Sequence, residues 1–499
     1  MRKIIKLFYG LFVAVMWILV LCLSLELFTR VVLKTANYLY RPLFEMQNAK
    51  AYKMVKLSEE LEEKYLVEKD YKPKDQIVFS SPKSSDLTSI NGDYLCKKNY
   101  ELTLKGVAEI YFDIDGNIIE SYGDPLIERY IYNIVNDLPV SYNDSSWDTV
   151  LEVIRNPSLA PYSAQLRYIG TYNHYYQVEI TQQSDGLVLI ARELRDSYPL
   201  SLIATYTSKS EDSAWLVPFF AYKPNVDRYN NLGFRDEDII LPKPEGVLRI
   251  LCVGGSTTEE GPSNDVTYPN IMERKLRKYF NTDKIEVINA GVIGQRSFGE
   301  VRRVNDFISL QPDLVVYYNA INDICLVDMP QWLKLPNSYR DTILYSDLLT
   351  RIFNRKLLPS DDYIADYFHR TIFRNLGAMN CGFSKQNIRM AICSFAYPKI
   401  EWYEFVARLY FDFNMRNAWL SLEDVMITFD TYIKVIQIYN RELKKFCERE
   451  NILYIPVAEE LNGGTDYFTD VCHMTQLGLY VKADIISSYV AKWIEESYR

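Results

Sequence analysis

The sequence predicts an α/β domain, a parallel sheet with helices on both faces, preceded by a membrane segment and a small α+β region. Three patterns predict this: an uncharged run near the N-terminus, short apolar runs around turn signals in the middle, and continuous apolar runs alternating with helical spacing from residue 230 onward. We expect an anchor with a cytoplasmic N-terminus at 1–34, a helical stalk and linker at 35–89, an accessory region at 90–222, and the α/β domain at 230–499 with insertions at about 331–388 and 397–428.

Composition excludes several classes of protein. The 499 residues are 48% hydrophobic and 24% charged, which is ordinary for a globular chain and excludes global disorder. The net charge of -9 argues against a nucleic-acid binder, which needs basic surface. Only His174, His369 and His473 could supply imidazole, so we expect no metal site and no cofactor. The eight cysteines are scattered, which leaves disulfide pairing open.

Residues 7–25 carry no charge, and a helix of that length spans roughly 28 Å, close to the thickness of the hydrocarbon core of a bilayer. Arg2, Lys3 and Lys6 precede the run, which favours a cytoplasmic N-terminus and a body on the extracytoplasmic side. A cleaved signal peptide and a buried helix are the alternatives, but no short apolar core with a small-residue cleavage site is evident. We therefore expect a single-pass anchor.

The region at 90–222 contains short apolar segments around Asp115-Gly116 and Asp185-Gly186, as expected of two hairpins. Between them, residues 147–154 (WDTVLEVI) have helical spacing, and 200–207 (LSLIATYT) is expected to be a further strand. In composition the region resembles a PAS-type sensory or binding fold. His174 lies here and is expected to be a surface or packing residue.

From residue 230 the apolar runs predict buried strands, and the segments between them predict amphipathic helices. Strands are expected at 248–254, 285–290, 313–320, 389–396 and 452–457, and helices at 268–280, 300–310, 431–450 and 477–497. In such sheets the loops after the carboxyl ends of the strands carry the ligand site.

Polar residues follow three of these strands. Gly254 and Gly255 precede Ser256, and a tight glycine turn can expose a serine hydroxyl as a nucleophile. The alternative is a phosphate-binding turn, but neither a Walker lysine nor a GxGxxG motif follows. Gly294 follows the second strand and could direct a backbone N–H into the site, and Asn322 follows the third and could donate to a developing oxyanion.

Asp470 stands three positions before His473, just ahead of the last helix. A carboxylate at that spacing can hold Nδ1 of the imidazole and leave Nε2 free to take a proton from a serine. Each motif alone is common. Their order, at the expected rim of one sheet, carries the interpretation.

At these residues the sequence resembles the SGNH hydrolases, also called GDSL esterases and lipases, through the blocks VGGSTT, NAGVIG, NAIND and DVCH. The resemblance covers about 230–330 and 386–499, and the upstream NLGFR segment is similar to that of membrane-anchored members. It implies a flavodoxin-like sheet with Ser256 as nucleophile, His473 as general base and Asp470 orienting it. The implied oxyanion hole is the backbone N–H groups of Ser256 and Gly294 with the Asn322 side chain.

Two positions depart from the family pattern. Gly255 stands where the family usually has aspartate, and Ala320 where it usually has glycine.

The resemblance implies a membrane-anchored serine esterase that cleaves an acyl ester of a carbohydrate or lipid, such as an O-acetyl group. A polysaccharide O-acyltransferase that uses the same triad, and a catalytically silent glycan- or partner-binding protein, are the alternatives. The substrate and the oligomeric state do not follow from the sequence.

Overall fold

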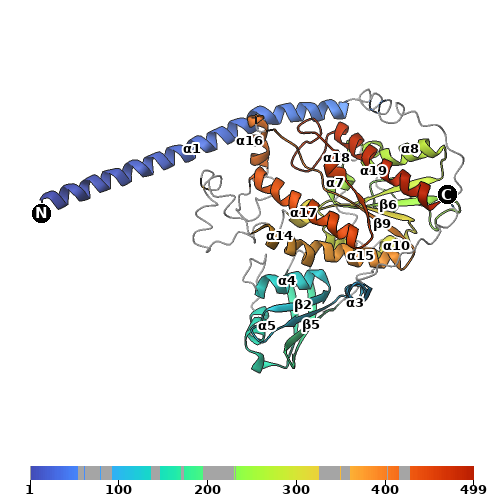
Figure 1. Cartoon of the computed structure of the whole chain (residues 1–499), viewed down its shortest axis with the longest axis horizontal. Coiled ribbons are helices and arrows are strands. Elements are labelled where there is room, and N and C mark those ends of the chain that lie inside the picture. Colours follow the sequence, from blue (N-terminus) through green and yellow to red (C-terminus); the bar gives the residue numbers. More distant parts are fainter. Residues whose placement is uncertain are drawn as a thin grey trace.

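The structure is a computed structural model of the whole chain (Figure 1). It describes residues 2–53, 93–135, 146–169, 173–194, 232–324, 360–401, 403–414 and 428–498, with 61, 64, 79, 230 and 349 as single positions. Outside the described residues lie the expected strand at 200–207, most of residues 54–89 in the expected stalk and linker (35–89), and parts of the expected insertions at 331–388 and 397–428.

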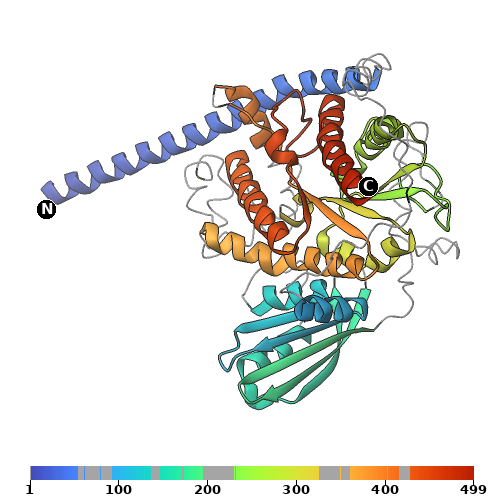
Figure 2. The same ribbon diagram turned by 45° about the vertical axis from the view of Figure 1, so that its right-hand side comes forward.

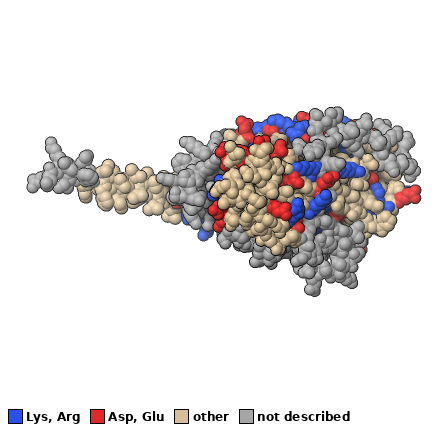
Figure 3. Space-filling view, turned by 90° about the horizontal axis from the view of Figure 1, so that it is seen from below, with Lys and Arg blue, Asp and Glu red and all other residues tan. Residues whose placement is uncertain are grey.

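The N-terminal segment is one helix, α1 (Arg2–Lys53), longer than the anchor the sequence predicts. Its stretch Tyr9–Val32 is long and apolar enough to cross a membrane, and none of it is buried against the body. In Figure 3 the tan stretch of the projecting helix shows no charged side chains, in contrast to the mixed charges of the body. The helix continues past this stretch without a break and packs against α16 (Phe405–Asn414) (Figure 1).

The accessory region is an antiparallel sheet of five strands in the order β2-β1-β5-β4-β3. Two hairpins form at the expected Asp-Gly turns, β1 with β2 and β4 with β5. The strands are β1 (Val107–Phe112), β2 (Ile118–Gly123), β3 (Tyr162–Ile169), β4 (Asn173–Gln183) and β5 (Gly186–Leu194).

Helices of the accessory region pack on this sheet because their apolar residues recur at helical spacing. These helices are α3 (Asp93–Leu104), α4 (Pro125–Val135) and α5 (Ser146–Arg155), with a short 3₁₀ turn at Pro157–Leu159. Trp147 of α5 is fully buried against Tyr130 of α4, and the core of this region is separate from that of the α/β domain. The PAS-like character of the region stays a prediction.

The second sheet is parallel, with five strands in the order β10-β9-β8-β6-β7. Numbered along the chain, this is the order 2-1-3-4-5 of flavodoxin-like sheets. Every residue of β6 and β8 is buried, as expected of strands covered on both faces. The strands are β6 (Leu248–Gly254), β7 (Ile285–Gly291), β8 (Leu314–Tyr318), β9 (Arg389–Cys393) and β10 (Leu453–Ile455).

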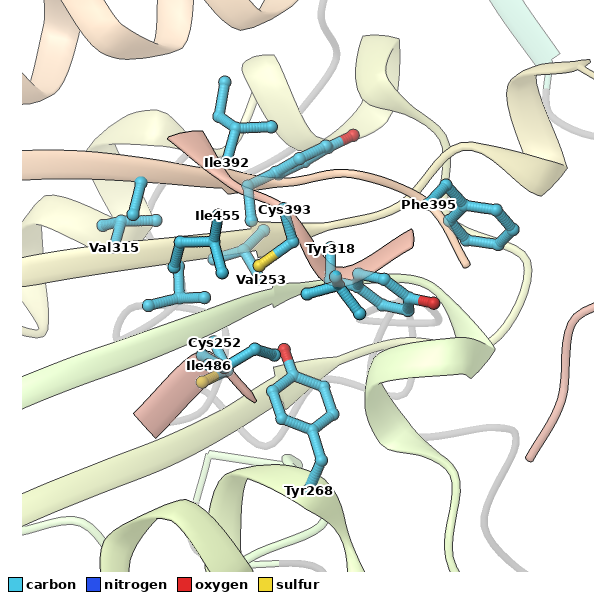
Figure 4. Close-up of a cluster of buried hydrophobic side chains, with 14 of the residues drawn as sticks. Cys252, Val253, Tyr268, Val315, Tyr318, Ile392, Cys393, Phe395, Ile455 and Ile486 are labelled. Carbon is cyan, nitrogen blue, oxygen red and sulfur yellow. The ribbon is translucent and has the colours of Figure 1, made fainter. Parts of the chain in front are cut away.

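Helices cover both faces of this sheet (Figures 1 and 2). On one face α8 (Tyr268–Phe280) packs against α19 (Gln476–Ser497). The other face carries α10 (Val304–Ser309), α15 (Arg374–Ser384) and α17 (Phe429–Arg449). Figure 4 shows aromatic, aliphatic and cysteine side chains of the strands and helices packed together in this core. The predicted fold class is therefore confirmed.

Two details differ from the sequence-based expectation. The helix expected at 300–310 is two helices, α9 (Ser297–Val301) and α10, with a turn at Arg302 and Arg303 between them. The insertion before β9 is largely helical where it is described, as α14 (Asp361–Phe368), a π-helical turn at His369–Phe373, and α15.

Buried ion pairs join the accessory region to the α/β domain. Arg374 at the start of α15 bonds Glu128 of α4 at 2.6 Å, and Arg302 bonds Glu193 of β5 at 2.5 Å. These contacts link the accessory region to the turn after α9 and to α15.

Candidate active site

The turn after β6 presents the Ser256 hydroxyl at the carboxyl edge of the parallel sheet. The strand ends at Gly254, and the short helix α7 (Ser256–Glu259) begins at the serine itself. The Thr258 hydroxyl donates to the Tyr318 carbonyl at the end of β8, 2.9 Å away. The Val292 N–H after β7 donates to the Gly254 carbonyl at 3.0 Å. The serine turn is thus bonded to the ends of both neighbouring strands.

The structure brings Ser256, His473 and Asp470 into one hydrogen-bonded chain. Nε2 of His473 lies 2.9 Å from Oγ of Ser256, across 217 positions of sequence. Nδ1 of the same ring lies 2.7 Å from Oδ2 of Asp470. This arrangement lets the imidazole take a proton from the hydroxyl while the carboxylate fixes the tautomer.

The loop that carries the histidine is shaped by the same aspartate. Oδ1 of Asp470 accepts from the backbone N–H groups of Cys472 and His473, at 2.9 and 2.7 Å. The Thr469 N–H donates to the His473 carbonyl, which closes the loop as a small hairpin. Two residues later, Thr475 caps α19 by accepting from the Gly478 N–H. The imidazole therefore stands on a loop held from both ends.

The ion pair shifts both pKa values in the directions expected of close opposite charges. Burial lowers the pKa of His473, but the adjacent Asp470 carboxylate outweighs this and raises the pKa to about 9. Burial raises the pKa of Asp470, and the bonds from His473 and Cys472 outweigh it and lower the pKa to about 2. The aspartate is thus ionised across the neutral range and favours the charged imidazole.

Gly294 and Asn322 lie on the loops after β7 and β8. Gly294 has a φ of 75°, a left-handed conformation that favours glycine. The Asn322 amide nitrogen donates to the carbonyl of Gln295 at 2.9 Å, which ties these two loops together. An amide NH₂ group has two hydrogens, so the bond to Gln295 leaves one for an oxyanion.

A buried polar network that the sequence did not reveal supports this side of the site. Asn319 donates both to the Gln295 carbonyl and to Glu300, each at 2.9 Å. Glu300 also accepts from the Tyr317 hydroxyl at 2.7 Å. Burial raises the pKa of Glu300 to about 8, despite these two bonds. The network fixes the Gln295 carbonyl that holds Asn322.

Three possible metal ligands meet within this site. Within the described part of the chain, the group of His, Cys, Asp and Glu side chains close enough to share an ion is Asp470, Cys472 and His473. Asp470 and His473 already bond each other there, and Nε2 of the imidazole bonds Ser256. The six cysteines whose side chains are described form no disulfide with one another.

The other two histidines lie away from this edge. His174 is on β4 of the accessory sheet, opposite Tyr168 of β3. His369 lies in the π-helical turn before α15, with Nε2 3.6 Å from a carboxylate oxygen of Glu442.

Comparison with solved structures finds similar folds for about half of the chain. A GDSL-like lipase from Bacteroides thetaiotaomicron has 16% identity and a TM-score of 0.27, covering 50% of this chain and 88% of its own. An acetylxylan esterase from Geobacillus stearothermophilus has 15% identity and a TM-score of 0.30, covering 49% and 94%. A psychrotrophic esterase from Pseudoalteromonas has 13% identity and a TM-score of 0.29, covering 50% and 98%.

No family model and no curated protein sequence matches the chain. The strand order and the meeting of all four sequence blocks at one sheet edge are the arrangement that the sequence resemblance implies. The fold is a flavodoxin-like parallel α/β sheet, the class that the resemblance to the SGNH hydrolases implies.

The structure shows the surroundings of Gly255 and Ala320, the two positions that depart from the SGNH sequence pattern. A Cβ at Gly255 would lie 2.7 Å from the amide nitrogen of Asn322, so a side chain there would press on the Asn322 amide. Ala320 has a φ of -164°, extended backbone that any residue adopts, so glycine is not required there.

Proposed function

We propose that this protein is a membrane-anchored serine esterase of the SGNH family, with Ser256 as nucleophile, His473 as general base and Asp470 as its orienting carboxylate. The observation that carries the proposal is the continuous chain of hydrogen bonds from the Ser256 hydroxyl through the imidazole to Asp470, at 2.9 and 2.7 Å. Such a chain is what activation of a serine requires.

In the first step the Ser256 oxygen attacks the ester carbonyl, and its proton passes to Nε2 of His473. The carbonyl oxygen then carries the negative charge, and the N–H groups of Ser256, Gly294 and Asn322 stabilise it. The tetrahedral intermediate collapses as the imidazolium returns the proton to the leaving alcohol, which leaves an acyl-enzyme. A water molecule, deprotonated by His473, attacks the acyl group and releases the acid and the free serine.

The test is ester hydrolysis by the full-length chain in detergent micelles, with p-nitrophenyl acetate as substrate. We expect Ser256→Ala to abolish turnover and labelling by a fluorophosphonate probe. The matched control is Ser488→Ala, on the exposed face of α19, which should keep both activities. Equal rates for the wild type and Ser256→Ala would reject the esterase and favour the non-catalytic binding protein.

Hydrolysis and transfer share the acyl-enzyme and differ only in the acceptor. We propose hydrolysis of small acyl esters, with O-acetyl groups on carbohydrate as the first substrates to test. Adding an oligosaccharide to the assay separates the alternatives. Acyl groups recovered on the sugar in preference to water would make the protein an O-acyltransferase.

We also propose that Tyr9–Val32 is an uncleaved anchor that leaves the body outside the cytoplasm. Two features support this: Arg2, Lys3 and Lys6 precede the apolar stretch, and α1 runs on unbroken to pack against α16. N-terminal sequencing of the mature protein and a periplasm-active reporter fused at the C-terminus test the two claims. A mature N-terminus beyond residue 32 would identify a cleaved signal. An inactive reporter would show that the C-terminus lies in the cytoplasm, the opposite of the proposed topology.

A further inference from the structure

A buried ion pair that the catalytic scheme does not use lies beside Ser256 and His473. Lys482 of α19 has a fully buried side chain, and its ammonium donates to Oε1 of Glu260 and to the carbonyl of Thr257, each at 2.8 Å. The same ammonium lies 4.6 Å from the ring centres of both Tyr268 and Tyr318. Both rings belong to the core cluster shown in Figure 4.

The second oxygen of Glu260 binds the histidine loop. Oε2 accepts from the backbone N–H of Met474 at 2.7 Å, across 214 positions of sequence. Thr257 directly follows Ser256 and Met474 directly follows His473. One ion pair therefore bonds to the neighbour of each residue of the catalytic hydrogen bond.

Stability alone is a poor explanation for this pair. Removing both charges from water costs several kcal/mol per ion, which their attraction commonly no more than repays. A hydrophobic pair of similar volume would serve the core equally well. The contacts are instead directed at two backbone groups, the Thr257 carbonyl and the Met474 N–H, which an apolar pair could not hold.

We propose that Glu260 and Lys482 are positioning residues, which hold the Ser256 turn and the His473 loop at the separation that the serine–imidazole hydrogen bond requires. This inference rests on the proposed esterase function. The pair forms a bridge from the end of α7 through α19 to the loop, and neither residue contacts the reacting atoms. Its loss should lower kcat and leave KM nearly unchanged, because misplacement by about 1 Å costs roughly 10²-fold in rate.

The pair also has an electrostatic effect on the imidazole, which reports in solution whether both charges face His473. In the described part of the chain, the titratable groups that face the His473 ring are Asp470 and Cys472 of its own loop, Glu260 from the end of α7, and Lys482 of α19. Asp470 is the stronger influence; Glu260 raises and Lys482 lowers the pKa of His473. Because the two effects oppose each other, the intact pair perturbs the imidazole less than either charge alone.

The experiment measures kcat/KM for p-nitrophenyl acetate against pH in full-length Lys482→Met, Glu260→Gln and the double variant. We expect the acidic limb of the Lys482→Met profile to move to higher pH and that of Glu260→Gln to lower pH, each by about half a pH unit. Each single variant should lose roughly 10- to 100-fold in kcat. In the double variant the midpoint of the acidic limb should lie close to that of the wild type, because both charges have been removed.

The matched control is Lys275→Met. Lys275 of α8 is also buried and also pairs with an acid of α19, Asp484. We expect it to lower the melting temperature and to leave the pH profile and kcat unchanged.

The outcomes separate the two proposals. If wild-type turnover depends on Ser256 but the single variants lower only the melting temperature, as the control does, the positioning role is wrong. If wild-type turnover survives Ser256→Ala, the esterase itself is wrong. A loss of kcat at nearly unchanged KM in the single variants, absent from Lys275→Met at the same loss of melting temperature, supports the positioning role even where both single variants are partly destabilised.

Discussion

Substituting Gly255 by alanine tests the oxyanion side of the site with a single methyl group. Gly255 has a φ of -88° and a ψ of -154°, so alanine fits the backbone without strain. The obstacle is space, because the new Cβ would lie 2.7 Å from the amide nitrogen of Asn322 and 3.2 Å from the side-chain oxygen of Asn319. The substitution therefore acts on Asn322 while it leaves Ser256 and His473 in place.

The size of the effect follows from that contact. To reach an ordinary separation of about 3.5 Å, the Asn322 amide has to retreat by about 0.8 Å. A displacement of that size costs roughly 10²-fold in rate when the group stabilises a transition state. Complete loss of one oxyanion donor, as in Asn322→Ala, costs about 10²–10³-fold in kcat, or roughly 2.7–4 kcal/mol. We expect Gly255→Ala to lower kcat by about 10²-fold with little change in KM.

The assay is a double-mutant cycle on the full-length chain with p-nitrophenyl acetate, comparing the wild type, Gly255→Ala, Asn322→Ala and the double variant. If the methyl group acts through Asn322, the double variant should be no slower than Asn322→Ala. The control is Gly377→Ala on α15, where a Cβ would meet only the Phe446 ring at 3.8 Å. Wild-type kcat in Gly255→Ala, or fully additive losses in the double variant, would refute the role assigned to Asn322.

Three further predictions concern charge. Because Asp470 raises the pKa of His473, the acidic limb of the wild-type pH profile of kcat/KM should have its midpoint above pH 6.5. Asp470→Asn should move that midpoint to lower pH and slow turnover. An unmoved midpoint would contradict the pairing of Asp470 with His473. For Glu300, burial raises the pKa from 4.5 to about 8, so its contribution to stability is complete below about pH 4.5 and is lost as the pH rises toward 8. Glu300→Gln should therefore raise the melting temperature relative to the wild type at pH 9 and change it little at pH 4, with thermal scans at both pH values as the check. Burial raises the pKa of Glu128 to about 8, so its ion pair with Arg374 is fully formed only above that pH. Arg374→Met should therefore lower the free energy of unfolding by about 3 kcal/mol in a urea titration at pH 9, and an unchanged midpoint there would show that the pair does not contribute to docking of the accessory region.

Much of the α/β domain could be predicted because its strands are continuous apolar runs. The run at 248–254 and the helical spacing at 268–280 coincide with β6 and α8. The site residues were found because each follows a strand or precedes the last helix, and the structure brings Ser256, Asp470 and His473 within hydrogen-bonding distance. Their catalytic roles remain proposals.

The supporting residues carry no comparable signal. Glu260 and Lys482 are 222 positions apart, and nothing in either local sequence indicates a buried pair. The carbonyl of Gln295 holds Asn322 through a backbone atom, which any residue type could supply. The division of the 300–310 helix coincides with Arg302, which reaches Glu193 of the accessory sheet and could not be anticipated from helical periodicity.

With the proposed anchor in place, the unbroken course of α1 limits how far the protein can reach from a membrane. With Tyr9–Val32 in a bilayer, the remaining 21 residues of the helix rise roughly 32 Å and lie partly along the body itself, against α16. A continuous helix fixes the distance between the membrane and the body, whereas a flexible tether allows a range of distances that grows with its length. The proposed esterase would therefore act only in a thin layer next to the membrane. Its encounters with substrate would depend on lateral diffusion within that layer.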